Sequence, residues 1–415
     1  MNDILIILNH QPKIPPFMLS AIQCAKKQYD KIFYINTRYP KFADVFYDDN
    51  NIVFLQPTNK GRNIAKLKAF FNFFCKSTLI NILHCISDKG FKISYIKSFL
   101  VGLSSDACIR PIADRVIKEH SNDRITVLST WLAYCAYSAA CLKKKYKHIK
   151  AVSLAHSYEI LVIRDPLVPY HFVDFKHKYL DGIYFIANTM RAMYLDGVGN
   201  LPTEYQDRMH VCYLGSYKAF PVTNKTNPEI FNVCSCSRMI ALKRLDILIS
   251  ALEKWDNGVI RWTHLGDGPL MNELKEKAQL VMSKNPLVEI IFKGFVPNNE
   301  VESYYASNPV DLFINLSNIE GLPISIMEAI SYGIPVIATD VGGTKEIVCK
   351  EVGMLLPPNI TPLLVYESIR DFYLKSKEER LQMRLSAYNY WENNFDAANN
   401  MNNLFEHIKK IIDYA

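Results

Sequence analysis

Arg238 and Lys243 are two cations that lie five residues apart in a predicted loop. The loop follows a pattern of buried-strand type that ends near Cys234. Arginine offers a planar fork of donors and lysine a compact charge, so the pair suits a diphosphate group. Two solvated surface cations also fit this spacing, and the hypothesis of an anion site therefore depends on further motifs.

A glycine turn closes the next predicted strand at Gly266, Asp267 and Gly268. Because glycine has no Cβ atom, such a turn lets the backbone approach a ligand closely. A plain tight turn is the alternative interpretation. We predict that these three residues line the same site as the two cations.

The most informative stretch begins at Glu320 and predicts a helix that starts at an anion site. Pro323 is typical of a first helical turn, and an apolar helical pattern follows over Ile324–Ser331. Unpaired amides at a helix start attract anions. The residues assigned to this start are Gly321, Leu322, Pro323 and Ile324.

Two glutamates flank this helix start. Glu320 precedes the helix, and Glu328 lies in its second turn, about 7–8 Å further along the axis. Carboxylates are poor partners for phosphates but good acceptors for hydroxyl groups. We therefore expect amides and cations to hold phosphates and the glutamates to hold sugars. An ordinary capped helix with a solvated Glu328 is the alternative, and the order of the three motifs disfavours it.

Runs of buried-strand type alternate with helical patterns along the chain. The first series of predicted strands is Ile4–Leu8, Lys31–Ile35, Ile52–Leu55, Ile125–Leu128, Ala151–Leu154, Gly182–Ile186 and His210–Tyr213. The second series is Ile230–Cys234, Ile260–Leu265, Val288–Phe292, Leu312–Leu316, Pro335–Ala338 and Gly353–Leu355. Helical patterns between them include Arg244–Leu252, Leu270–Met282, Asn299–Ser307 and Ile324–Ser331. Such alternation predicts parallel, doubly wound sheets.

The alternation occurs twice, which predicts two Rossmann-like α/β domains. A polar stretch from Pro221 to Pro228 separates them, so we expect domains at 1–220 and 221–390. In open parallel sheets, ligands bind beyond the carboxyl ends of the strands. Two such domains facing each other would place a site in the cleft between them.

Four motifs in order resemble glycosyltransferase family 4. They are S-x-R-x-x-x-x-K, G-D-G-P, E-G-L-P-x-S-x-x-E-A and G-I-P-V-I-A-T-D-V-G-G, within about 230–350. The resemblance implies the two-domain glycosyltransferase B-type fold, with an acceptor-binding first domain and a nucleotide-sugar-binding second domain. Trp391–Phe395 resembles the family's C-terminal segment, which implies that residues 391–415 cross back to the first domain.

The stretch Ala151–Glu159 resembles the H-x-x-D stretch of family members that make exopolysaccharides and capsules, with Glu159 in place of the usual Asp. The resemblance implies that His156 contacts the donor sugar near the reaction centre. A core histidine is the alternative. Many members have a glycine-rich loop after the first strand, whereas this chain has Asn9–Lys13, so the contacts of this loop are left unassigned.

The resemblance implies a retaining enzyme that transfers a sugar from a nucleotide-diphosphate sugar. The acceptor would be a hydroxyl of a saccharide or lipid-linked saccharide in cell-surface polysaccharide assembly. The catalytic residues would be His156, Arg238, Lys243 and Glu320, and Glu328 would hold the ribose. No cofactor is implied, and because no Asp-x-Asp motif lies in a suitable place we expect no metal site.

Other functions stay open at this point. A nucleotide-sugar epimerase could use the same scaffold, and the unusual first loop leaves room for a non-catalytic scaffold. A nicotinamide-dependent oxidoreductase is disfavoured, because no G-x-G-x-x-G with a later acidic residue follows the first strand. The lysine run at 143–150 has no nucleic-acid recognition motif beside it, so we expect no nucleic-acid partner.

Charge and cysteine content bear on location. Residues 1–220 carry 29 basic and 17 acidic residues, a balance of +12, whereas residues 221–415 have a balance of −5. The ten cysteines lack zinc-site spacing, which predicts reduced core thiols of a cytoplasmic protein.

Two stretches bear on a membrane partner. Lys60–Leu83 interleaves apolar and basic residues at helical spacing, which fits an ordinary surface helix or a helix on the anionic inner face of the plasma membrane. The uncharged stretch 125–142 predicts a strand and a helix rather than a membrane span.

Overall fold

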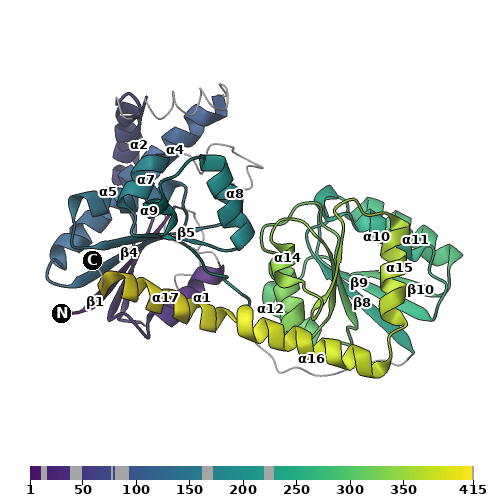
Figure 1. The fold of residues 1–415 in the computed structure, drawn as a ribbon. Coiled ribbons are helices and arrows are strands. Elements are labelled where there is room, and N and C mark those ends of the chain that lie inside the picture. Colours follow the sequence, from purple (N-terminus) through teal and green to yellow (C-terminus); the bar gives the residue numbers. More distant parts are fainter. Residues whose placement is uncertain are drawn as a thin grey trace. The chain divides into compact units, whose positions relative to one another are not determined.

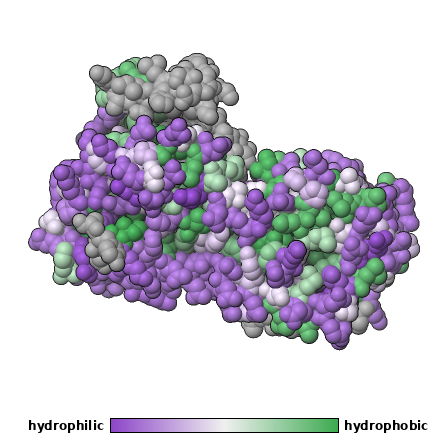
Figure 2. Space-filling model, viewed as in Figure 1, coloured by the Kyte–Doolittle hydropathy of each residue, from purple (hydrophilic) through white to green (hydrophobic). Residues whose placement is uncertain are grey.

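The computed structural model describes residues 1–10, 16–37, 49–75, 78–79, 93–160, 172–218 and 229–413. The chain divides into two compact units, shown in Figure 1. Unit 1 comprises residues 1–214 and 398–415, and unit 2 comprises residues 215–397. The roles expected for the ranges 1–220, 221–390 and 391–415 stay predictions. Figure 2 shows many hydrophilic residues on the surface of each unit, with patches of hydrophobic residues among them.

A seven-stranded sheet forms the centre of unit 1, in the order β3-β2-β1-β4-β5-β6-β7. The strands are β1 (Asp3–Asn9), β2 (Lys31–Asn36), β3 (Ile52–Leu55), β4 (Arg124–Ser129), β5 (Lys150–Ala155), β6 (Gly182–Phe185) and β7 (Met209–Val211). All neighbours pair in parallel. Continuous buried apolar runs such as Ile4–Leu8 are typical of parallel strands with both faces covered.

Helices connect these strands. They are α1 (Pro16–Ala25), α2 (Asn59–Phe73), α4 (Ile93–Glu119), α5 (Tyr134–Lys145), α6 (Ser157–Ile160), α7 (Val173–Tyr179), α8 (Asn188–Val198) and α9 (Thr203–Gln206). Helices α2 and α4 lie side by side, as Figure 1 shows. A small apolar cluster of Ala69, Phe99, Leu103 and Phe172 joins them.

Unit 2 contains a six-stranded parallel sheet in the order β10-β9-β8-β11-β12-β13. Its strands are β8 (Ile230–Cys236), β9 (Val259–Leu265), β10 (Val288–Phe292), β11 (Leu312–Asn315), β12 (Val336–Thr339) and β13 (Gly353–Leu356). Its helices are the 3₁₀ turn η3 (Ala241–Lys243), α10 (Leu245–Leu252), α11 (Met271–Lys284), α12 (Asn298–Ser307), α13 (Ile324–Ser331), α14 (Thr344–Ile347), α15 (Pro362–Tyr373) and α16 (Lys377–Asn394).

Each sheet reverses its strand order once, and this reversal marks where a ligand would bind. In unit 1, β1 lies between β2 and β4, and in unit 2, β8 lies between β9 and β11. Loops that leave neighbouring strands in opposite directions open a crevice at the carboxyl edge of such a sheet. The motif residues follow β5, β8, β9 and β11, so they lie at these carboxyl edges.

The last helix, α17 (Ala397–Asp413), returns the chain to unit 1. Its buried residues recur at the spacing of one helix face and are Ala397, Met401, Leu404, Phe405 and Ile408. The ring of Phe405 lies 5.9 Å from that of Tyr29. Lys409 Nζ lies 2.9 Å from Asp3 Oδ2. Apolar packing and an ion pair thus hold the C-terminal helix against the beginning of the chain.

The structure confirms the two doubly wound α/β sheets. Each predicted strand range overlaps one of the strands β1–β13, and the stretch 125–142 forms β4 and α5. No helix among the described ranges is long and apolar enough to cross a membrane.

Two expectations need correction. Helix α2 ends at Phe73, where the Phe74 amide donates to the Phe71 carbonyl oxygen (3.1 Å), so the helix expected over Lys60–Leu83 is shorter; residues 80–83 lie outside the described residues. Cys75 is exposed, so not every thiol lies in the core; Cys85 lies outside the described residues.

Candidate functional site

In unit 2, the loop that follows β8 packs against the loop that follows β9. The Ser237 amide donates to the Leu265 carbonyl oxygen (3.1 Å), and the Met239 amide donates to the Asp267 carbonyl oxygen (2.9 Å). The Met239 side chain is fully buried. The first two motifs therefore form one framework at the carboxyl edge of the sheet.

Two glycines allow this close packing of loop on loop. Gly266 has φ = +144°, and a Cβ atom there would lie 1.9 Å from the Ser237 carbonyl oxygen. A Cβ atom at Gly268 would lie 2.4 Å from the Met239 carbonyl oxygen. Packing against the loop after β8 therefore explains why residues 266 and 268 are glycines. Asp267 is exposed and accepts from the Gly268 amide (2.6 Å); the contact of these residues with a ligand stays a prediction.

Lys243 and Glu320 form an ion pair, with 2.6 Å between Nζ and Oε1. Asn315 Nδ2 donates to the same carboxylate oxygen (3.2 Å). The two side chains are only 22% and 13% exposed, so water screens the pair weakly. The other oxygen, Oε2, accepts no hydrogen bond from the residues described. The structure therefore brings these two predicted residues together and leaves one carboxylate oxygen available for a hydroxyl group.

Arg238 lies on the same loop as Lys243 but is exposed. In the described part of the chain, no hydrogen bond or ion pair of its guanidinium group is present, and no contact joins it to Lys243. The convergence of these two cations on one anion therefore stays a prediction.

Arg244 is a residue of the site framework that sequence reasoning missed. Its backbone is left-handed (φ = +49°). Its guanidinium group donates to the carbonyl oxygens of Leu316 (2.6 Å), Ser317 (2.9 Å) and Pro358 (2.7 Å). One side chain thus fastens the loops that follow β8, β11 and β13. The one signal in the sequence was a third cation directly after Lys243.

The glycine pair that follows β12 supports the Glu320 loop. The Gly343 amide donates to the Gly321 carbonyl oxygen (2.7 Å). Gly342 has φ = +55°, and a Cβ atom there would lie 1.8 Å from the Glu320 carbonyl oxygen. The loop that carries Glu320 therefore rests directly on the backbone of this glycine pair.

Replacing Gly342 with alanine is expected to lower the free energy of unfolding by more than the usual cost of a left-handed backbone. That cost is about 1–2 kcal/mol, and the clash with a backbone oxygen at 1.8 Å adds to it. Gly294→Ala is the matched control, since φ is +74° there and no atom lies within 4 Å of the added Cβ. Urea unfolding measures both losses, and equal losses would contradict this packing.

The start of α13 has backbone amides without partners. Pro323 is the N-cap, and the helix spans Ile324–Ser331, the range that the apolar pattern predicts. Leu322 is buried, whereas Ile324 is 51% exposed. Among the described residues, no acceptor is present for the amides of Gly321, Leu322 and Ile324. Binding of an anion by these amides stays a prediction.

Glu328 projects from the second turn of α13 and is largely buried. Burial raises the pKa of its carboxyl group to about 7, and the nearby Glu302 charge adds to this rise. Its charge acts on Cys236 and Tyr305, which lie around it. Its carboxylate accepts no hydrogen bond within the described part of the chain. Glu328 can therefore accept a hydrogen bond from a ligand hydroxyl.

Glu328→Gln is expected to remove one part of the pH dependence of stability. The folded chain holds the Glu328 proton more tightly than the unfolded chain, whose carboxyl pKa is 4.5. The stabilisation is complete below that pKa and is lost as pH rises to about 7, by at most about 3 kcal/mol. Urea unfolding across this range measures the change. The exposed Glu276→Gln is the control, and an unchanged slope in Glu328→Gln would contradict the assignment.

In unit 1, His156 lies directly after β5 and is buried. Its Nε2 lies 3.0 Å from the Thr130 carbonyl oxygen. The rings of Trp131 and Phe17 lie 4.5 and 4.7 Å away. Burial lowers the pKa of His156 to about 4, so the imidazole is neutral near pH 7. Since Nε2 must then donate to the carbonyl oxygen, Nδ1 is the acceptor nitrogen.

Glu159 ties the loops after β4 and β5 together. Its carboxylate accepts from the amides of Leu132 (3.1 Å), Ala133 and His156 (3.0 Å). Burial raises its pKa to about 7, and the fully buried Lys176 opposes that rise. Lys176 Nζ donates to the Leu132 carbonyl oxygen (3.0 Å). Sequence reasoning noted Glu159 only as a replacement of Asp and missed Lys176, which the structure shows as a second support of the His156 loop.

The first loop can be described only in part. Asn9 is buried, and its Oδ1 accepts from Thr130 Oγ1 (3.1 Å). His10 contacts Cys135 (3.6 Å between Nδ1 and Sγ) and packs on Tyr134. Residues 11–13 lie outside the described residues. The end of β1 therefore supports the loop after β4, whose Thr130 carbonyl oxygen contacts His156.

Two further predictions concern metals and nucleic acids. No cluster of three or more His, Cys, Asp or Glu side chains suited to a metal ion occurs among the residues that the structure describes. In the lysine run, Lys143 lies 3.3 Å from Asp181, and Lys145 pairs with Asp114. Intramolecular ion pairs thus occupy part of this run.

Comparison with known proteins identifies the family of the second unit. Residues 218–390 match the family described as Glycosyl transferases group 1. The amylovoran biosynthesis glycosyltransferase AmsK of Erwinia amylovora is 27% identical over 133 residues, or 30% of this chain and 32% of that protein. The uncharacterized glycosyltransferase MJ1059 of Methanocaldococcus jannaschii is 24% identical over 342 residues, or 76% of this chain and 74% of that protein.

Solved structures show the fold. HepE of Anabaena in complex with UDP aligns with a TM-score of 0.67 at 16% identity, over 99% of this chain and 100% of that chain. The first three curated relatives are matched over only 28–32% of their own length. The chain therefore has the glycosyltransferase B-type fold and carries, over residues 218–390, a domain of the family Glycosyl transferases group 1.

Proposed function

We propose that the chain is a retaining glycosyltransferase of cell-surface polysaccharide biosynthesis. It would move a sugar from a nucleotide-diphosphate sugar to a hydroxyl group of a lipid-linked saccharide. The observation that carries this proposal is the shielded Lys243–Glu320 pair beside the free amides of the α13 start. A solved complex of HepE with UDP-glucose and the amylovoran relative support the donor class and the pathway class.

The donor site would act mainly on the leaving group. When the bond between sugar and diphosphate breaks, negative charge builds on the diphosphate. Lys243, Arg238 and the amides of the α13 start would stabilise this charge without rearrangement, which is the usual source of large electrostatic rate effects. Glu320 Oε2 would accept from sugar hydroxyls, and Glu328 would accept from the ribose.

The acceptor hydroxyl would attack on the face that the diphosphate leaves. A bond forms between the acceptor oxygen and the anomeric carbon, and the hydroxyl proton passes to the leaving phosphate oxygen. This step needs no protein nucleophile, metal ion or cofactor. His156 Nδ1, neutral near pH 7, would accept a hydrogen bond from the donor sugar.

Acceptor-dependent release of the nucleoside diphosphate tests the proposal. We expect release only with both substrates present, an anomeric configuration by NMR equal to that of the donor, and full activity with EDTA. A rearranged free nucleotide sugar formed without acceptor would indicate an epimerase. Failure to bind any nucleotide sugar would indicate a non-catalytic scaffold.

We also propose that the chain is cytoplasmic and attaches to the anionic inner face of the plasma membrane through α2. The apolar side chains of Leu67, Phe71 and Phe74 are 58–64% exposed, and Lys66 and Lys68 are exposed between them. Exposed phenylalanines among lysines on one helix are typical of an interfacial helix. The excess of basic residues in the first half of the chain adds attraction to anionic lipid.

Vesicle flotation is expected to recover more protein with anionic than with neutral vesicles. The double variant Phe71→Ser/Phe74→Ser should lower this recovery, since it removes apolar surface that would enter the lipid. Leu280→Ser in unit 2, which also changes an exposed apolar side chain, is the matched control. Equal recovery with both vesicle types, or an equal effect of the control, would contradict the attachment.

A further inference from the structure

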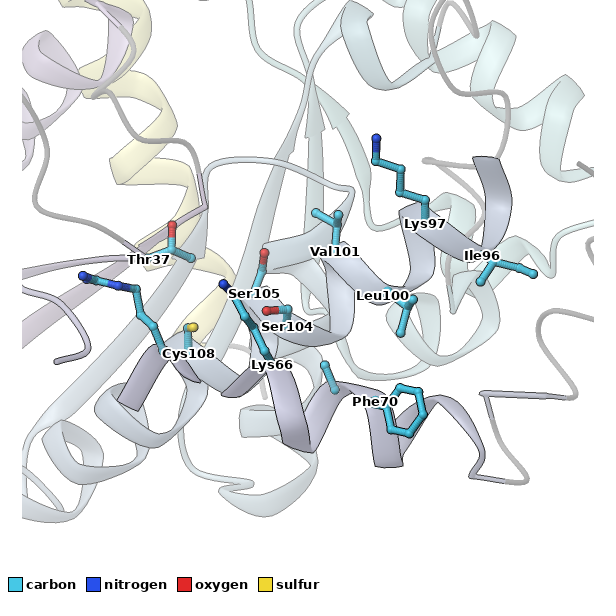
Figure 3. A pocket seen from close by; sticks show the side chains of 12 residues that line it. Thr37, Lys66, Phe70, Ile96, Lys97, Leu100, Val101, Ser104, Ser105 and Cys108 are labelled. Carbon is cyan, nitrogen blue, oxygen red and sulfur yellow. The ribbon is translucent and has the colours of Figure 1, made fainter. Parts of the chain in front are cut away.

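A cavity of about 580 Å³ lies between α2 and α4 in unit 1, away from the motif residues of the proposed sugar transfer. This volume lies within the range of about 300–1,000 Å³ that is usual for small-molecule sites. Figure 3 shows the side chains that line it. One end of the cavity is polar and the other is apolar, which is the division expected for a ligand with two chemically different parts.

The polar end carries hydroxyl groups and cations but no carboxylate. Thr37, Ser104, Ser105 and Lys66 point their polar atoms into this end in Figure 3. Arg62 also lines it. No Asp or Glu side chain lines the cavity among the residues that the structure describes.

Both cations and Cys108 line the cavity. Burial raises the pKa of the Cys108 thiol, and the charges of Arg62 and Lys66 oppose this rise. Arg62 donates to the Pro57 carbonyl oxygen (3.2 Å) and to Asn59 Oδ1, which fixes its guanidinium group. Within the described ranges, Lys66 Nζ makes no hydrogen bond or ion pair. A fixed arginine and an unpaired lysine therefore share one space.

One carboxylate beside the lining residues of this end, that of Asp106, has partners of its own. Asp106 is buried beside Ser105, but it accepts from Ser138 Oγ (2.9 Å) and pairs with Arg110 (2.9 Å). Its charge is therefore matched by partners of its own. The cations of the cavity keep their attraction for an anion from outside the chain.

The other end is formed mainly by the apolar side chains of Phe70, Ile96, Leu100 and Val101, and a third cation, Lys97, lines the cavity beside them. Phe70 is 54% exposed and Val101 is 43% exposed, and both side chains line the cavity. A hydrocarbon chain lying along these side chains would remove their apolar area from water, which favours binding.

We propose that this cavity binds one molecule of an anionic amphiphile, namely a phosphate monoester on an unbranched or isoprenoid hydrocarbon chain. The phosphate lies at the polar end against Lys66, Arg62 and the serine hydroxyls, and the chain lies along Phe70, Ile96 and Leu100. A phosphate offers three acceptor oxygens and about two negative charges, which matches two cations and several hydroxyl donors. Charge complementarity and the two-part lining select this occupant over a neutral lipid.

Calorimetric titration of the full chain with dodecyl phosphate, kept below its critical micelle concentration, tests the proposal. No sugar donor, acceptor or vesicle is present, so the outcome is independent of the proposed transfer and of membrane attachment. We expect saturable binding with one site. Inorganic phosphate and dodecyl maltoside should each bind at least about tenfold more weakly, because each lacks one of the two parts.

Matched variants on the same helix locate the site. Lys66→Gln should weaken binding of dodecyl phosphate about tenfold or more, as expected for loss of a charge-assisted hydrogen bond. Phe70→Ser should weaken it several-fold. The controls Lys68→Gln and Phe71→Ser change exposed side chains of the same helix that do not line the cavity, and they should alter the Kd by less than about twofold.

Three results would overturn the proposal. Absence of binding would exclude the site, and equal binding of dodecyl maltoside or of inorganic phosphate would exclude the two-part recognition. Equal losses of affinity in the cavity variants and in their controls would mean that the general charge or hydrophobicity of the surface, not the cavity, holds the ligand. All four substituted side chains are exposed, and thermal unfolding checks that the variants fold.

Discussion

Lys243→Ala is expected to lower kcat by about 100-fold or more, as loss of a preorganised charge at a leaving group does. Lys243 is the partly buried cation of the proposed donor site, with its ammonium group 2.6 Å from Glu320. Because water screens it weakly, its charge acts strongly on a diphosphate that becomes more negative during bond breaking. Arg238→Ala is expected to lower kcat by a similar factor, also about 100-fold.

The pairing with Glu320 calls for a control within the site. Lys243→Ala leaves the Glu320 carboxylate without its cation, and this negative charge alone could repel a diphosphate. The double variant Lys243→Ala/Glu320→Gln removes that charge. Glu320→Gln alone is the reference: if Lys243 acts on the diphosphate, the double variant has a much lower kcat than Glu320→Gln, whereas equal kcat values would mean that Lys243 only neutralises Glu320. Lys254→Ala, an exposed cation of the same unit, should leave kcat unchanged.

Lys176→Met is expected to destabilise unit 1 by about 1–3 kcal/mol, because it removes the donor to the buried Leu132 carbonyl oxygen as well as a charge that acts on Glu159. Lys176 is fully buried, and its charge favours the ionised form of Glu159. Without it, the pKa of Glu159 rises further above about 7. A carboxyl group whose pKa is raised by folding loses stability as pH increases, so the deficit should grow from about pH 5 to about pH 8.

Urea unfolding at these two pH values measures the deficit. Lys178→Met is the matched control, because Lys178 lies two residues further along α7 and is exposed. A deficit in Lys176→Met that does not change with pH would contradict the effect of the Lys176 charge on Glu159. Lys176→Met should weaken catalysis only indirectly, since Lys176 and Glu159 hold the loop after β4 that contacts His156.

The strands were predictable because parallel strands are buried on both faces and leave continuous apolar runs. Ile4–Leu8 and Val336–Ala338 are examples, and both are buried throughout. The parallel, doubly wound arrangement followed from the alternation with helices, whereas the order of the strands in each sheet did not. The position of Lys243 and Glu320 at the carboxyl edge of the second sheet followed from the parallel arrangement, although their direct contact did not.

Contacts between distant segments were not predictable. Arg244 donates to carbonyl oxygens that lie 72–114 residues away along the chain, and no local pattern encodes such a partner. Gly342 carried a glycine signal, but only the structure shows that the Glu320 carbonyl oxygen requires it. The end of α2 at Phe73 was missed because the apolar and basic pattern continues beyond the last helical turn.

Nucleotide binding by the wild-type chain and Lys243→Ala tests the central claim most directly. The measurement is the shift in Tm caused by UDP, GDP or ADP, compared with the shift caused by the matching nucleoside, since ligands that bind the folded chain raise Tm. We predict that one diphosphate raises the Tm of the wild-type chain well above its nucleoside, and that Lys243→Ala loses most of this difference. If no diphosphate exceeds its nucleoside, or if the variant keeps the full difference, Lys243 does not hold a diphosphate and the proposed donor site is wrong.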